Sequence, residues 1–280
     1  MDRLRRFAVS LYAAPPDLPV ARFCAMLAAR GIGGIGLTAR AVENLDPEAL
    51  ARLLRDHDLR ATSLNSAGYV LHIDPAAVAA QAALDVKLLD AAAALDAPVN
   101  VILGGTLHAA APGGEAPPLR EAWRRAAEGL ARLAEHARAT GVRLALEPMH
   151  PLAVGTKGCI NQISHVRALA ARHPGVGLTL DLYHSWWDAD LPAAVAETDV
   201  LVAQVCGLGV PADGTPPVRA ELSAGPSDLA LFLRDLDAAE YAGAVEYEVF
   251  WEPMGRPDAD GLLDRATRDW LALTSPAAAP

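Results

Sequence analysis

Acidic and amide side chains end four short apolar runs in the second half of this chain. The runs read LALE, LTLD, VAQ and VEYE, and the polar residues that end them are Glu147, Asp181, Gln204 and Glu248. A carboxylate at the end of a buried strand is costly unless something compensates its charge. If the four runs are neighbouring parallel strands, the four groups form one ring, in which three unpaired carboxylates would repel one another.

A divalent cation is the natural compensation for such a ring, because hard cations prefer several oxygen ligands. Three carboxylates and one amide oxygen favour Mn²⁺ or Mg²⁺, with Co²⁺ and Zn²⁺ as further candidates. Glu246 shares a strand face with Glu248 and is the rival ligand, but it lies deeper in the strand. The competing interpretation is that all of these are ordinary polar strand ends bonded to loop backbone. We predict one metal ion, held by Glu147, Asp181, Gln204 and Glu248.

Further candidate binding residues lie in the loops beyond the same strand ends. His150 and His184 each follow an acidic strand end by three residues, in EPMH and DLYH. On a helix this spacing would suggest a di-iron bundle, but here each acid ends a strand, so the histidines are predicted to lie on loops above the acids. That placement suits substrate binding. The remaining candidates for substrate binding are Arg219, Lys157, His108 and Trp186. For each of them the alternative is a side chain that is merely exposed to solvent or packed against the protein.

Apolar runs that alternate with helical patterns predict the scaffold. Eight strands are predicted at 7–11, 33–37, 59–64, 99–103, 142–146, 176–180, 200–205 and 244–249. Helices are predicted at 20–30, 47–56, 75–95, 119–140, 159–173, 191–197, 227–237 and 260–273. Strict alternation without a linker favours a single (β/α)8 barrel over a doubly wound sheet. We predict one barrel domain over 1–275, a frayed tail at 276–280, and an active face at the C-terminal strand ends.

The overall composition excludes several classes of partner. The net charge is −10, from 24 basic and 34 acidic residues, and the basic ones are scattered. This argues against nucleic acid, which needs a basic stripe. No apolar run is long enough to cross a membrane. The N-terminal apolar run favours a strand over a signal peptide. The three cysteines lie far apart in the sequence, which indicates reduced thiols. We predict a cytoplasmic protein, whose alanine-rich outer helices would permit a homodimer.

Several of these segments together resemble a known family. LALEPMHP, GLTLDLYHSWWD, VAQVCG and YAGAVEYEVF resemble the sugar phosphate isomerase/epimerase family, within the xylose-isomerase-like TIM barrel superfamily. The resemblance covers nearly the whole chain. It implies a single divalent ion held by the four residues named above, with Glu147 and Glu248 doubling as the acid/base pair. His184 would correspond to the family's substrate-contacting histidine, and Arg219 to its loop arginine.

The chain also departs from that pattern. Most relatives have histidine where this chain has Gln204, and an aspartate where it has Gly207. Glutamine at the ligand position also occurs in hydroxypyruvate-isomerase-like members, so the resemblance still allows metal binding. The second strand ends in Thr38 rather than in the acidic residue common in related epimerases.

The ligand set predicts proton transfer on a small polyhydroxylated substrate. An α-hydroxy ketone or aldehyde would bind through adjacent oxygens, and the cation would stabilise the enediolate formed on proton loss. Return of the proton by Glu147 or Glu248 gives epimerisation or isomerisation of a sugar or polyol-like substrate. Two alternatives remain: a dehydratase or lyase of the dehydroshikimate or keto-inositol type, and a non-catalytic barrel that binds a small polar ligand.

Overall fold

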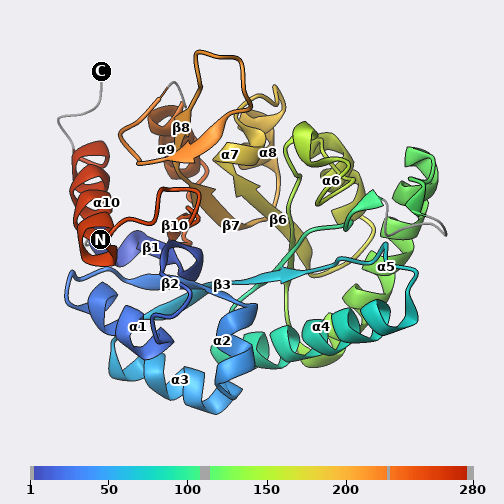
Figure 1. The fold of residues 1–280 in the computed structure, drawn as a ribbon, viewed down its shortest axis with the longest axis horizontal. Coiled ribbons are helices and arrows are strands. Elements are labelled where there is room, and N and C mark those ends of the chain that lie inside the picture. Colours follow the sequence, from blue (N-terminus) through green and yellow to red (C-terminus); the bar gives the residue numbers. More distant parts are fainter. Residues whose placement is uncertain (1–2, 108–113, 226–227, 276–280) are drawn as a thin grey trace.

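Eight parallel strands close into a barrel in the computed structural model, which describes residues 3–107, 114–225 and 228–275 (Figure 1). Neighbouring strands pair in chain order, and β10 pairs with both β7 and β1 to close the ring. The barrel strands are β1 (Phe7–Ser10), β2 (Gly34–Thr38), β3 (Arg60–Ala67), β4 (Val99–Val101), β5 (Leu144–Leu146), β6 (Val176–Asp181), β7 (Val200–Val205) and β10 (Val245–Tyr247). This confirms the predicted barrel and all eight predicted strands. The tail predicted at 276–280 lies outside the described residues.

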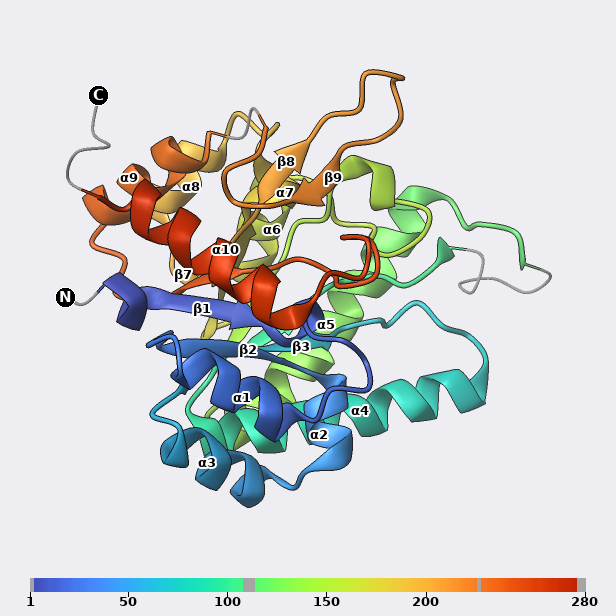
Figure 2. The same ribbon diagram turned by 60° about the vertical axis from the view of Figure 1, so that its left-hand side comes forward.

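Helices cover the outside of the barrel (Figures 1 and 2). They are α1 (Val20–Ala28), α2 (Ala39–Asn44), α3 (Pro47–Asp56), α4 (Pro75–Leu95), α5 (Leu119–Thr140), α6 (Ile163–Ala170), α7 (Leu182–Ser185), α8 (Leu191–Glu197), α9 (Leu229–Ala238) and α10 (Ala259–Leu273). Local chemistry sets their ends. Asp46 caps α3 by accepting a hydrogen bond from the backbone N–H of Ala49, and Gly141 ends α5 with a φ of 73°. No helix in the described ranges is both long and apolar enough to cross a membrane.

One predicted helix starts later than its sequence pattern indicated. The pattern placed its beginning at residue 159, whereas α6 begins at Ile163. The backbone of Cys159 bonds to Leu103, and the carbonyl of Ile160 accepts from the N–H of Met149. These long-range backbone bonds keep the segment extended and compete successfully with its helical propensity.

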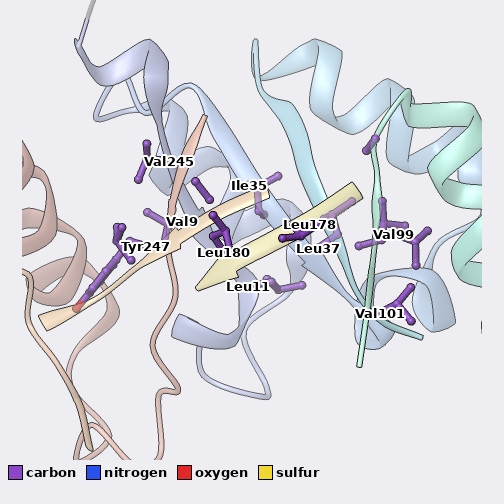
Figure 3. Close-up of a cluster of buried hydrophobic side chains, with 14 of the residues drawn as sticks. Val9, Leu11, Ile35, Leu37, Val99, Val101, Leu178, Leu180, Val245 and Tyr247 are labelled. Carbon is purple, nitrogen blue, oxygen red and sulfur yellow. The ribbon is translucent and has the colours of Figure 1, made fainter. Parts of the chain in front are cut away.

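The apolar core lies between the barrel wall and the helices. Figure 3 shows part of it, with labelled side chains such as Val9, Leu180 and Val245 from different strands. On the outer surface of β1, Phe7 stacks on Trp270 of α10, with ring centroids 4.8 Å apart. Burying a side chain of this kind contributes about 1.5–3 kcal/mol relative to leaving it exposed. This outer layer holds the strands in place and leaves the barrel interior free for other residues.

The interior of the barrel is polar rather than aliphatic. Strand alternation turns small residues of β1 and β2 inward, including Ala8 and Gly36. The other strands contribute buried polar side chains to the interior: Ser63, Asn65, Asn100, Thr179, Gln204 and Glu246. Buried polar groups require hydrogen-bond partners, so this layer forms a network directly beneath the C-terminal strand ends.

Several short elements beyond the strand ends were not predicted, among them α2, which directly follows β2. A two-stranded antiparallel sheet, β8 (Gly207–Gly209) and β9 (Val218–Ala220), follows β7 and lies beside α7 (Figure 2). The hydroxyl of Tyr183 in α7 donates to the carbonyl of Pro217, which joins the two elements. Three-residue strands and a four-residue helix are too short to show a hydrophobic period. The β8–β9 hairpin matters because it carries Arg219.

Candidate active site

The four predicted ligands lie at the same end of the barrel, and all are buried. Glu147 directly follows β5, Asp181 ends β6, Gln204 lies in β7, and Glu248 directly follows β10. Asp181 and Gln204 face each other in register on neighbouring strands. Each of the four is at most 4% exposed. The parallel register therefore gathers groups that are far apart in sequence.

The tightest grouping comprises Glu147, Asp181 and His184. One potential ligand atom from each lies within 4.8 Å of the other two. Nε2 of His184 lies 3.7 Å from Oε1 of Glu147 and 4.0 Å from Oδ2 of Asp181. These three buried residues could hold a metal ion. Glu248 lies outside this grouping of acidic and histidine ligands.

Hydrogen bonding assigns the ring proton of His184. The backbone N–H of His150 donates to Nδ1 of His184 at 3.0 Å, so Nδ1 must carry a lone pair. Burial lowers the pKa of His184 to about 3, and the neutral ring therefore carries its proton on Nε2. Nε2 thus presents a donor to the carboxylates. A metal ligand would need a lone pair at that nitrogen.

Arg219 joins Glu248 to the group. Its guanidinium forms ion pairs with both carboxylates: Nη2 contacts Oδ2 of Asp181 and lies 2.8 Å from Oε2 of Glu248. The side chain is 7% exposed and stacks over Tyr183 and Phe250, with distances of 4.6 and 5.4 Å to the ring centroids. The β8–β9 hairpin therefore places a positive charge between two of the predicted ligands.

Three carboxyl groups in one site have different affinities for protons. Burial, and then the charge of Asp181, raise the pKa of Glu147. Burial also raises the pKa of Glu248 well above its usual value, and Arg219 offsets only part of that rise. Burial acts on Asp181 as well, but the charge of Arg219, together with hydrogen bonds from Arg219 and the backbone of Tyr183, outweighs it and holds the pKa of Asp181 below its ordinary value. The site consequently contains an aspartate whose pKa is lowered, beside two glutamates whose pKa values are raised.

Asn100 fixes the position of Glu147. Its Nδ2 donates to Oε2 of Glu147 at 2.7 Å, and its Oδ1 accepts from the hydroxyl of Thr179 at 2.8 Å. The bond occupies one oxygen of Glu147 and leaves Oε1 directed toward His184. A hydrogen bond of this kind keeps a reactive carboxylate in one orientation.

Gln204 offers the clearest sign that these residues could accommodate a cation. Its Nε2 donates to Glu246 at 3.1 Å and to Glu248 at 3.2 Å. Its Oε1 is buried and has no hydrogen-bond partner among the residues that the structure describes. An unpaired buried oxygen costs about 1–3 kcal/mol. A hard cation that prefers oxygen ligands would remove that cost, so the donor set fits a divalent metal.

The remaining predicted binding residues differ in how close they come to the carboxylates. His150 contributes its backbone N–H to His184, and its ring lies beside Tyr183. Lys157 lies 5.7 Å from the centre of the Phe250 ring, and its charge counteracts part of the rise in the pKa of Glu147. Trp186 packs against the apolar core, with a buried indole N–H that lacks a partner within the described ranges. The predicted residue His108 lies outside those ranges.

A cluster of hydroxyl groups on the opposite side of the site was missed. Tyr12 follows β1, and its buried hydroxyl is hydrogen-bonded to Ser66 at the end of β3. The hydroxyls of Ser66 and Tyr69 are 3.2 Å apart. Burial first, and then the negative charges of Glu248, Tyr69 and Glu147, raise the pKa of Tyr12. Extending the strand-end rule to the first half of the chain would have found Ser66.

The structure also explains Gly207, where the chain departs from its relatives. A Cβ at this position would lie 1.7 Å from the carbonyl oxygen of Glu221. In β8, Gly207 pairs with Ala220, one residue from Arg219. The close approach of the backbone that brings Arg219 into the site therefore excludes an aspartate at residue 207.

Comparison with protein families gives one match, which covers most of the chain. Residues 24–272 match the model of the family described as xylose isomerase-like TIM barrel. A comparison with curated protein sequences gives no match.

Solved structures give many matches over nearly the full length. A protein from Sinorhizobium meliloti 1021 superposes with a TM-score of 0.86 at 26% identity, covering 96% of this chain and 98% of that one. The IolI protein with a bound zinc atom gives a TM-score of 0.76 at 15% identity, with the same coverage. The apo form of 3-keto-D-glucoside 4-epimerase, YcjR, from E. coli gives 0.70 at 17% identity, again covering 96% and 98%.

Proposed function

This chain belongs to the xylose isomerase-like TIM barrel family, and from that premise we propose that it is a divalent-metal-dependent isomerase or epimerase. Its substrate would be a sugar or polyol-like α-hydroxy ketone or aldehyde. Among the structural neighbours, one is a sugar epimerase and another holds a zinc atom, and both support this assignment.

The observation that carries the proposal is the gathering of three buried carboxyl groups, Glu147, Asp181 and Glu248, at one end of the barrel, and their affinities for protons differ. Glu147 and Glu248 have raised pKa values, whereas that of Asp181 is lowered. An enzyme that removes a proton and returns it elsewhere needs two groups that exchange protons near neutral pH. Asp181 remains ionised between them and, with the unpaired Oε1 of Gln204, provides oxygen ligands for a cation.

In this mechanism the residues of the chain have separate tasks. When bound, the divalent ion would supply positive charge that stabilises the negative charge developing on the substrate oxygens. Glu147, held by Asn100, would accept the proton at Oε1 from the carbon next to the carbonyl group. Glu248 would return a proton, to the other face of that carbon for epimerisation or to the neighbouring carbon for isomerisation.

Two donors would orient the substrate. Nε2–H of His184 and the guanidinium of Arg219 both lie among the carboxylates and are buried. Both would donate hydrogen bonds to substrate oxygens. Where Asp181 and Glu248 held the ion, the donors of Arg219 would be free for this contact.

One observation favours a second candidate, a barrel that binds a small polar ligand without a metal. Arg219 already compensates Asp181 and Glu248 in the described structure. If it remains there permanently, the carboxylates need no cation. The two candidates differ in metal content, which can be measured directly.

The test combines metal analysis with solvent exchange. Protein dialysed against Mn²⁺ and then against buffer is expected to retain one equivalent of metal by elemental analysis. Incubation with a panel of ketoses and keto-inositols in D₂O should then give isomers that carry one deuterium. Loss of water from a substrate would point to a dehydratase instead. Absence of both retained metal and exchange would contradict the proposal.

A further inference from the structure

Glu246 is a buried carboxyl group that the proposed mechanism does not use. It lies in β10, two residues before Glu248, and is fully buried. The neighbouring strand β2 leaves space for it, because a Cβ at Gly36 would lie 2.1 Å from Oε1 of Glu246. A carboxylate buried inside a barrel requires donors on every side.

An irregularity in β3 supplies two of those donors. Ile35 pairs with Ala61, but Gly36 pairs with Ser63, so Thr62 is an extra residue in β3. Such a bulge allows consecutive side chains to reach one point. The hydroxyls of Thr62 and Ser63 each donate to Oε2 of Glu246 at 2.7 Å.

The direction of the hydrogen bonds makes Glu246 an acceptor. Nδ2 of Asn100 donates to Glu147 and also to Oδ1 of Asn65, at 2.7 and 2.8 Å. Asn65 therefore presents its own Nδ2 to the oxygen of Ser63, at 2.7 Å. Since Ser63 accepts at that position, its hydroxyl proton is directed to Glu246.

This arrangement determines which way the amide of Gln204 faces. Nε2 of Gln204 donates one hydrogen to Oε1 of Glu246 and the other to Oε1 of Glu248. The reverse orientation would place the amide oxygen against Oε1 of Glu246, the carboxyl group that already accepts from Thr62 and Ser63. With both hydrogens committed, Oε1 of Gln204 is the atom that remains buried and unpaired.

We propose that Glu246 is a positioning residue that holds Gln204 with its carbonyl oxygen, rather than its NH₂ group, available to the divalent cation. The inference rests on the proposed function, since it presumes a cation at Asp181 and Glu248. It accounts for three features together: the buried carboxyl group of Glu246, the space that Gly36 leaves for it, and the bulge at Thr62 that supplies donors to it. It also explains how this chain uses glutamine where most relatives have histidine.

The test measures Mn²⁺ affinity by isothermal titration calorimetry, so it does not depend on catalytic activity. Glu246→Gln keeps the shape of the side chain, but it lets an NH₂ group face Gln204 and frees that amide to turn over. We expect Mn²⁺ binding at least tenfold weaker, within the range of about 10–100-fold found when partners of metal ligands are removed. Thr62→Val removes one donor to Glu246 and should weaken binding only a few-fold. Far-UV circular dichroism and thermal unfolding establish that each variant is folded.

A double-mutant cycle separates positioning from general destabilisation. Gln204→Met removes the amide, so adding Glu246→Gln to that variant should change Mn²⁺ affinity less than twofold. A tenfold loss in both backgrounds would overturn the positioning role. Wild-type affinity in folded Glu246→Gln would also overturn it, while leaving the proposed function intact. If the wild-type protein binds no Mn²⁺, the proposed function and this inference both fail.

Discussion

The two halves of the barrel mouth differ in their chemistry. The half formed by β5, β6, β7 and β10 supplies the charged groups, Glu147, Asp181 and Glu248, with Arg219 between them. The half formed by β1 and β3 supplies uncharged hydroxyls, from Tyr12 and Ser66. Charged groups with shifted pKa values suit proton transfer, whereas hydroxyls both donate and accept hydrogen bonds and suit recognition of a polyhydroxylated molecule. The barrel thus separates charged groups, on the side of β5, β6, β7 and β10, from uncharged hydroxyls on the side of β1 and β3.

The largest effect is expected from removing a proton-exchanging group of the charged half. Glu147→Gln should lower the rate of deuterium exchange into a substrate by about 10²–10⁴-fold, because an amide cannot accept the proton. Glu248→Gln should have an effect of the same order. The rate is measured by mass spectrometry under single-turnover conditions. Retention of wild-type exchange in either variant, with the metal still bound, would remove that residue from the mechanism.

A substitution of Arg219 tests whether the stability of the protein depends on the positive charge beside Asp181 and Glu248. Arg219→Met leaves Asp181 and Glu248 buried without their cation, which should lower the free energy of unfolding of the metal-free protein by about 3 kcal/mol. Saturating Mn²⁺ should restore part of that loss, since the ion takes over the compensation. Urea unfolding with and without Mn²⁺ measures both effects. Equal stability of variant and wild type without metal would show that Arg219 does not compensate these carboxylates.

A smaller effect is expected for the residue that holds Glu147. Asn100→Ala removes the donor to Oε2 of Glu147 and should slow exchange about tenfold without abolishing it. Thr179→Val removes the bond to Asn100 and a longer one to the carbonyl of Ala145 but leaves Asn100 itself in place; it is the matched control and should change the rate less. Rates that fall in the opposite order would contradict the positioning role of Asn100.

The smallest effect on the reaction is expected from the hydroxyl groups near the ends of β1 and β3. Tyr12→Phe and Tyr69→Phe remove one hydroxyl each and should raise KM a few-fold while leaving kcat nearly unchanged. Steady-state kinetics on whichever substrate shows exchange provide the measurement. A drop in kcat comparable to that of Glu147→Gln would mean that reactivity is not confined to the charged half.

The same comparison shows what could be predicted from the sequence. Acidic residues that end apolar runs stand out, because a buried carboxylate is costly and needs a reason. Glu147, Asp181 and Glu248 therefore stand out in the sequence, and the β/α alternation predicts the barrel that gathers them at one end. Hydroxyls give no such signal. Ser66 and Tyr12 carry no charge that would mark them in the sequence, and only the closed barrel brings the ends of β1 and β3 to the same mouth as the carboxylates.

The partners of the charged residues could not be predicted for a different reason. Arg219 lies in a hairpin too short to show periodicity, and its ion pairs depend on the close backbone approach at Gly207. From the sequence, Glu246 could be considered only as a rival ligand. Strand alternation predicts the face of the strand on which its side chain lies, but not the residues that the side chain contacts. The bulge at Thr62 and the space at Gly36, which show what Glu246 contacts, arise from pairing between β2 and β3.

The central claim is that the charged half holds a divalent cation, and a crystal structure of the protein soaked in Mn²⁺ tests it most directly. Anomalous scattering should show a single Mn²⁺ within about 2.0–2.6 Å of oxygens from Glu147, Asp181, Gln204 and Glu248. Arg219 should then be turned away from Asp181. A map without an anomalous peak, in which the guanidinium still bridges Asp181 and Glu248, would contradict the account.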